Sequence, residues 1–157
     1  MSLRLVRAPE PYERLDGDGP SLFLAGGITG IEDWQSRAEI LAGRAGFPVT
    51  VFNPRRAGFD MTREADSVEQ IAWEHRLLRA ADLVLFWFAE GPSTQPITLF
   101  ELGSAAERPG RIAVGVHPSY SRAMDVRQQL RHVRPEVEVR STLEEVVAEA
   151  LRALRDG

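Results

Sequence analysis

Residues 82–105, DLVLFWFAEGPSTQPITLFELGSA, contain the pattern that decides the fold. After its first residue the segment 82–89 is apolar throughout, which is typical of a strand at the centre of a parallel sheet, buried on both faces. A short loop rich in turn residues follows at 90–95, and Pro96 can occupy the first turn of a helix. We therefore predict a buried strand, a loop and a helix over 97–108, which together make one repeat unit of an α/β fold.

The same alternation continues on both sides of this segment. Further strands are predicted at 21–26, 48–54 and 111–117, with a weak edge strand at 136–140, and further helices at 31–46, 66–81, 121–133 and 142–156. Residues 57–65 are predicted to be a loop, and residues 1–20 an irregular lead-in with a candidate short strand at 3–6. This order predicts a single α/β domain over 1–157, with a flavodoxin-like five-stranded parallel sheet (order 2-1-3-4-5) and helices on both faces.

Composition excludes several classes of protein. The formal net charge is −4, whereas nucleic-acid binders are usually basic. The chain has no cysteine, so it has neither disulfides nor thiolate metal sites. The N-terminal segment lacks the apolar core of a signal peptide, and no apolar run approaches the roughly 18 residues of a membrane span. We expect a cytoplasmic protein that binds neither nucleic acid nor membranes.

Ligands of open α/β sheets bind beyond the carboxyl ends of the strands, so the loops after the first three strands are expected to form the site. The first loop contains Gly26 and Gly27 but is neither a dinucleotide fingerprint nor a P-loop. These glycines would let a ligand approach the backbone closely, or would simply form a tight turn. Candidate polar ligand contacts from the other loops are Asn53, Arg55, Arg56, Ser93, Thr94 and Gln95, with surface ion pairing and helix capping as the alternatives.

Glu101 is an unexpected acid in apolar surroundings, between Phe100 and Leu102. It follows Pro96 by five residues and so lies in the first or second turn of its helix. A helix N-terminus favours the ionised form of an acid, and an ionised carboxylate in a sheltered cleft can act as a nucleophile. The alternative is a partly buried glutamate that accepts hydrogen bonds from loop backbone.

Glu74 is the second candidate carboxylate. Ile71, Glu74 and Leu78 are spaced i, i+3 and i+7, which predicts Glu74 on or beside the helix face that packs on the sheet. Partial burial there would raise the pKa of Glu74 and allow it to donate a proton. Two carboxylates at one edge of a sheet suit glycoside chemistry, in which one attacks the anomeric carbon and the other protonates the leaving group. A nucleobase is such a leaving group.

Four segments resemble the nucleoside 2-deoxyribosyltransferase family, and more narrowly its bacterial "nucleoside 2-deoxyribosyltransferase-like" branch. They are LFLAGGITGIEDW, FNPRR, QIAWEHRLLRAADLVLFWF and STQPITLFELGSA, in this order, within residues 21–117. The resemblance implies that Glu101 of the ELG stretch is the nucleophile. It also implies that Glu74, eight residues before Asp82, assists proton transfer, and that the loop from Gly26 to Gly30, with Ile28 and Thr29, borders base and sugar. It implies a homo-oligomer as well, with sites completed by a neighbouring chain.

Position 95 departs from the family pattern, because well-studied members have an Asp six residues before the nucleophile where this chain has Gln95. An amide can hydrogen-bond a base edge but cannot transfer a proton. Among aromatic residues, Phe88, beside Trp87, could stack on a base or belong to the core, and Trp34 could wall the pocket.

The sequence therefore predicts cleavage or transfer at the N-glycosidic bond of a small-molecule nucleoside or nucleotide, through a covalent glycosyl-enzyme on Glu101, without metal or organic cofactor. Two alternatives stay open. One is a nucleotide-binding module of the same fold without turnover. The other is a different flavodoxin-like protein, such as a flavin carrier or a receiver domain, although the acid cluster and phosphorylatable Asp of a receiver are missing.

Overall fold

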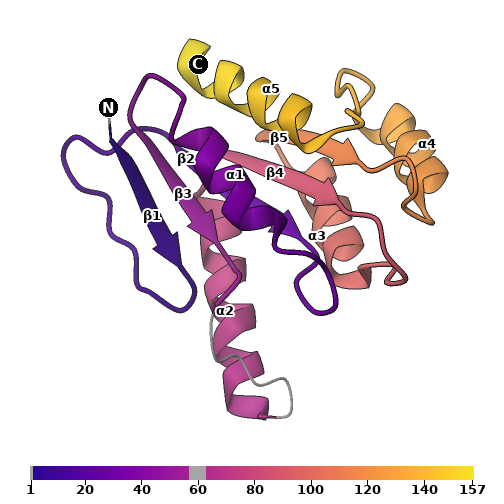
Figure 1. Cartoon of the computed structure of the whole chain (residues 1–157), viewed down its shortest axis with the longest axis horizontal. Coiled ribbons are helices and arrows are strands. Elements are labelled where there is room, and N and C mark those ends of the chain that lie inside the picture. Colours follow the sequence, from indigo (N-terminus) through magenta and orange to yellow (C-terminus); the bar gives the residue numbers. More distant parts are fainter. Residues whose placement is uncertain (1, 57–62) are drawn as a thin grey trace.

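A parallel five-stranded sheet forms the centre of the structure (Figure 1). The structure, a computed structural model, describes residues 2–56 and 63–157. The strand order is β1-β3-β2-β4-β5, and every neighbouring pair is parallel. The strands are β1 (Leu3–Arg7), β2 (Ser21–Gly26), β3 (Val49–Asn53), β4 (Leu83–Phe88) and β5 (Arg111–Val116).

Helices cover both faces of the sheet (Figure 1). On one face α1 (Trp34–Ala42) packs beside α5 (Leu143–Asp156). On the other lie α2 (Glu64–Ala80), α3 (Pro96–Glu107) and α4 (Ala123–Val133). Each face has its own apolar core, and the central strands β2 and β4 contribute alternate residues to both. The α/β fold with a five-stranded parallel sheet is therefore confirmed.

The identity of the fifth strand differs from the expectation. The predicted edge strand at 136–140 makes only an isolated bridge, from Arg140 to Gly115. The fifth strand is instead β1, from the predicted lead-in, which pairs along its whole length with β3. Leu3 and Leu5 of β1 pack against one core and Val6 lies in the other, whereas 136–140 alternates glutamate with valine and offers a single apolar face. Burial on both faces decides which segment joins the sheet.

Element bounds otherwise differ from the expected ones by a few residues. The predicted loop at 57–65 falls mainly outside the described residues, and its last two positions already belong to α2.

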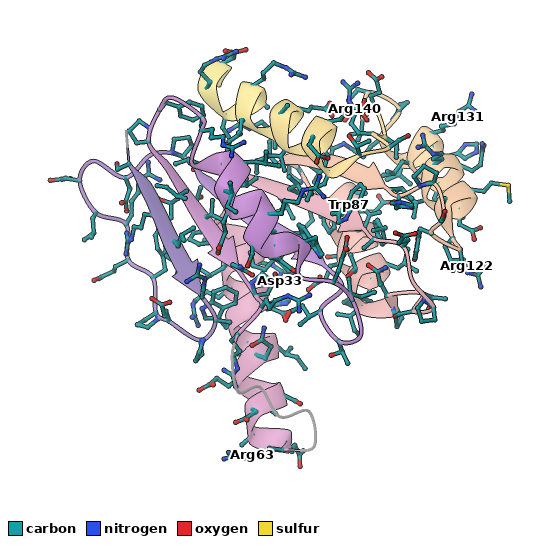
Figure 2. The ribbon with its side chains drawn as sticks, viewed as in Figure 1. Asp33, Arg63, Trp87, Arg122, Arg131 and Arg140 are labelled. Atoms are coloured by element: carbon teal, nitrogen blue, oxygen red, sulfur yellow. The ribbon has the colours of Figure 1, made fainter. Side chains whose placement is uncertain are left out.

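Side chains differ in burial according to their place in the layers. Trp87 of β4 is buried under the helices that cover the sheet, while Arg122 and Arg131 at α4 are exposed on the outside (Figure 2). Within residues 2–56 and 63–157, no helix combines the length and apolarity that crossing a bilayer requires.

Gly26, at the end of β2, is required by packing. A Cβ atom there would lie 2.3 Å from Cζ2 of Trp34 and 2.6 Å from the backbone oxygen of Trp87. Because backbone and a buried indole cannot both move aside, we expect Gly26→Ala to destabilise the protein by about 1–3 kcal/mol. Thermal unfolding measures this loss.

Gly103→Ala is the matched control. This glycine is exposed within α3, and a Cβ there meets nothing within 4 Å. Alanine should therefore raise stability by about 0.5–1 kcal/mol through helix propensity. Equal stability of wild type and Gly26→Ala would contradict the packing argument.

Candidate active site

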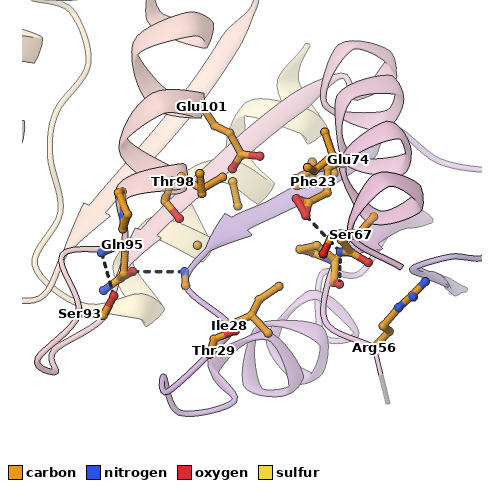
Figure 3. Close-up of a pocket in the computed structure, with 18 residues that line it drawn as sticks. Phe23, Ile28, Thr29, Arg56, Ser67, Glu74, Ser93, Gln95, Thr98 and Glu101 are labelled. Carbon is orange, nitrogen blue, oxygen red and sulfur yellow. Dashed lines mark hydrogen bonds between the residues drawn. The ribbon is translucent and has the colours of Figure 1, made fainter. Parts of the chain in front are cut away.

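A cavity of about 410 Å³ opens at the carboxyl ends of β2 and β3, with α2 and α3 on its sides (Figure 3). From β2 the chain continues through α1 to β3 on one side of β2, and from β3 it continues through α2 to β4 on the other side. The loops that follow β2 and β4 therefore run in opposite directions and leave a crevice between them. Its volume lies in the range of small-molecule sites. The lining residues are Phe23, Ala25, Gly26, Gly27, Ile28, Thr29, Pro54, Arg56, Ser67, Gln70, Ile71, Glu74, Ser93, Gln95, Pro96, Ile97, Thr98 and Glu101.

The structure brings Glu74 and Glu101 to this one cavity. Glu74 projects from the middle of α2 and Glu101 from the second turn of α3, and Figure 3 shows both carboxyl groups directed into the space between these helices. Apolar side chains such as Phe23, Ile71 and Ile97 make up much of the remaining wall. Two acids from distant parts of the chain therefore face one ligand-sized space.

Burial changes the acidity of both groups. Removal from water, followed by the repulsion of Glu74, raises the pKa of Glu101 to about 8. The pKa of Glu74 is also raised by burial, and a hydrogen bond from Gln70 acts in the opposite direction. The expectation that the helix N-terminus favours an ionised Glu101 is therefore wrong, because desolvation and a like charge outweigh the helix dipole. With a pKa of about 8, Glu101 is largely protonated near neutral pH.

Gln70 is buried beside Glu74 and was missed by the sequence reasoning. Its Nε2 donates to the carbonyl oxygen of Pro54 at 2.7 Å and to Oε1 of Glu74 at 3.1 Å. A signal was present: Ser67, Gln70 and Glu74 are spaced i, i+3 and i+7, so they share one helix face. On α3, Thr98 similarly precedes Glu101 by three residues.

The buried stripe of α2 also differs from the predicted one. Gln70, Trp73 and Leu77 face the core, whereas Ile71 is 66 % exposed at the cavity rim. Glu74 lies on the margin of this stripe, which explains why it is partly buried and yet borders the cavity.

The glycine loop after β2 is held from several sides. Gln95 accepts a hydrogen bond from the backbone N–H of Gly27 at 3.2 Å and donates to the carbonyl oxygen of Ala89 at 2.9 Å. The carbonyl oxygen of Gly27 in turn accepts from Nε1 of Trp34 and Nε2 of Gln35. A Cβ on Gly27 would lie 2.9 Å from the Gln95 amide oxygen, so this glycine serves loop packing as well as ligand access.

Gln95 itself adopts a left-handed backbone conformation, with φ 52°, and its side chain is buried. A non-glycine residue holds this conformation only where its surroundings determine it. Both ends of its amide cross-link the loops after β2 and β4, so Gln95 orders the cavity wall.

Five predicted site residues lie outside the cavity lining, and one of them, Thr94, uses its carbonyl oxygen to accept a hydrogen bond from the hydroxyl group of Tyr120. Trp34 and Phe88 are core residues, and Phe88 stacks on Tyr120 with ring centroids 5.1 Å apart. Asn53 is buried against Glu39, to which its Nδ2 donates at 2.9 Å. Arg55 binds protein groups instead of facing the cavity: its guanidinium donates to Gln35 and to the carbonyl oxygens of Ile28, Ile31 and Glu32, which fastens the glycine loop.

Arg56 lines the cavity in place of Arg55. Its Nη1 lies 2.7 Å from Oε1 of Glu69 and its Nη2 3.8 Å from Oδ1 of Asp66. Two consecutive arginines thus have different roles, since one supports the loop and the other borders the cavity. In the described part of the chain, no cluster of three or more His, Asp or Glu side chains is arranged to hold a metal ion.

Fold and cavity together define an α/β protein with two carboxyl groups in one small-molecule site. Residues 19–120, well over half of the chain, match the family described as "Nucleoside 2-deoxyribosyltransferase like", and the chain belongs to this family. The match points to a nucleoside deoxyribosyltransferase-like activity. Comparison with curated proteins gave no match.

The raised pKa of Glu101 predicts a stability change on substitution. Because the folded site favours the protonated acid, wild-type stability falls as pH rises from about 4.5, the ordinary pKa, to about 8. Glu101→Gln removes this charge, so its free energy of unfolding should exceed that of wild type by about 1–2 kcal/mol at pH 8. The difference should shrink toward pH 5. Thermal melts at several pH values measure it.

Glu107→Gln is the control, because Glu107 is an exposed residue at the end of the same helix. It should show no comparable pH-dependent gain. A Glu101→Gln protein that is less stable than wild type at pH 8 would mean that the carboxylate is well solvated or stabilised by a donor.

Proposed function

We propose that the protein cleaves or transfers the N-glycosidic bond of a nucleoside or nucleotide by double displacement. The observation that carries the proposal is the pair Glu74 and Glu101, two carboxyl groups that line one cavity. When Glu101 is ionised and Glu74 carries a proton, one group can attack while the other donates, which is the division of roles that a retaining glycoside mechanism needs.

The steps follow from these roles. The Glu101 carboxylate attacks C1′ of the sugar, and the C–N bond breaks with its electron pair moving to the base. Glu74 delivers a proton to the departing base, which makes it a better leaving group. A second base, or water, then gives its proton to Glu74 and displaces Glu101 from C1′, which restores the Glu101 carboxylate and the Glu74 acid. Transfer results in the first case and hydrolysis in the second.

The remaining cavity residues supply contacts with the substrate. Gly27, Ile28 and Thr29 would border base and sugar, and Ser93 offers a hydroxyl group. Gln95 contributes by fixing the loop geometry and cannot itself transfer a proton. Arg56 is the lining cation that a 5′-phosphate could approach.

The decisive experiment is incubation with deoxynucleosides, ribonucleosides and their 5′-monophosphates, each with and without a second free base. Base release and new nucleoside are followed by chromatography. Base release that needs the acceptor identifies a transferase, and release without it a hydrolase. Binding of a panel member with no turnover would instead support a nucleotide-binding module.

Substitutions should separate the two carboxyl groups. Glu101→Gln is expected to lower base release at least about 10³-fold, because an amide cannot act as the nucleophile. A 2-fluoro sugar analogue should leave an adduct on wild type, visible by intact mass, and none on Glu101→Gln. Glu74→Gln should lower the rate about 10²–10⁴-fold with poor leaving bases and less with activated ones. A fully active Glu101→Gln enzyme would refute the assignment.

We also propose that the protein is a homo-oligomer in which a second copy covers the cavity rim. Large apolar side chains are exposed beside the cavity on two helices: Val68 and Ile71 on α2, and Ile97 and Phe100 on α3. Phe100 is 76 % exposed. A set of apolar side chains gathered at a rim is typical of an interface.

Phe100→Lys tests this proposal. Placing a charge in the interface should shift the protein to a smaller species in light scattering coupled to size-exclusion chromatography. Met124→Lys, at a residue that is also exposed but lies on α4, is the control and should keep the wild-type mass. A monomeric wild type at tens of micromolar would contradict the proposal.

A further inference from the structure

Gln70 distinguishes the two carboxyl groups of the cavity. Its side chain is 6 % exposed and lies in the wall one helical turn before Glu74. Pro54 presents a backbone carbonyl, which only accepts hydrogen bonds, so Nε2 of Gln70 must face it, at 2.7 Å. This contact fixes the orientation of the amide.

The fixed amide determines what Glu74 meets. The same Nε2 lies 3.1 Å from Oε1 of Glu74, so an N–H group faces that oxygen and Glu74 is the acceptor. The other amide atom, Oε1 of Gln70, is buried without a hydrogen-bond partner in the described part of the chain, so it makes no hydrogen bond with Glu74 there. A donated hydrogen bond favours the ionised form of an acid.

Glu101 has no equivalent donor among the described residues. In the described residues no hydrogen bond reaches its carboxyl group, and the Glu74 charge acts on it through the cavity. The charged or titratable groups that line the cavity are Arg56 after β3, Glu74 on α2 and Glu101 on α3, and Arg56 is paired with Asp66 and Glu69. The donor from Gln70 is therefore the contact that makes the pair asymmetric.

We propose that Gln70 is a positioning residue that holds Glu74 as the ionised acceptor and so leaves the proton on Glu101 before a substrate binds. The consequence for catalysis rests on the proposed function. If Glu101 is the nucleophile, its proton must leave before attack and must finally reside on the departing base. Before substrate binds, the enzyme would then hold the proton on Glu101, although Glu74 is the group that donates a proton to the base.

Carbon-13 NMR of the glutamate carboxyl groups tests the proposal without any activity. The Glu74 and Glu101 signals are assigned by their loss in Glu74→Gln and Glu101→Gln. In wild type, Glu74 should titrate at lower pH than Glu101. In Gln70→Met, which keeps the side-chain length but lacks the donor, the Glu74 titration should move up by about half to one pH unit.

Gln35→Met is the matched control, because Gln35 is a fully buried glutamine beside the glycine loop but outside the cavity lining. It should leave both titrations in place. A wild type in which Glu101 titrates first would overturn the proposal, and so would a Gln70→Met protein with unmoved titrations. If Gln70→Met does not fold, the wild-type order still tests the proposal, because Glu101 titrating first would overturn it.

If base release is found, its pH profile gives a second readout. Gln70→Met should move the acid limb of kcat/KM to higher pH by a similar amount and should not move the basic limb to lower pH. A uniform fall in rate with both limbs unmoved would indicate a merely structural role and count against the proposal. Failure of the proposed function would appear as no base release with the NMR order intact.

Discussion

The site depends on one electrostatic constraint, which is that two carboxyl groups share a cavity with largely apolar walls. Removal from water penalises each charge, and the charge of Glu74 further penalises ionisation of Glu101. Glu101 therefore keeps its proton in a pH range where isolated glutamates have lost theirs. This arrangement lowers the stability of the folded protein near neutral pH and at the same time provides one acid and one base in the same small space.

Hydrogen bonds among polar groups behind the cavity help it keep its shape. Gln95 connects the loops after β2 and β4, and Arg55 binds three carbonyl oxygens of the glycine loop. These contacts satisfy backbone groups that would otherwise be buried without partners. Gln95 and Arg55, which could have contacted a ligand, thus position the loop that borders the cavity. The two carboxyl groups remain the principal charged groups of the cavity wall.

Much of the fold and the two central site residues could be predicted because they leave local signals. The apolar run of β4 indicates burial on both faces, and its alternation with helices indicates a parallel sheet. Glu101 stands out as an acid between Phe100 and Leu102, and helical spacing places Glu74 beside the buried stripe of α2. Helical spacing would also have indicated Ser67 and Gln70, which share the Glu74 face.

By itself, the sequence determined the five helices, four of the strands with their neighbouring order, and the sheet edge where the two acids lie, since periodicity and residue type report on local burial. Only the tertiary structure decided that β1 completes the sheet and that Arg55 faces the loop while Arg56 faces the cavity. It also decided that burial reverses the expected ionisation of Glu101. These outcomes depend on contacts between residues far apart in the chain, and a linear pattern does not specify which distant groups a side chain meets.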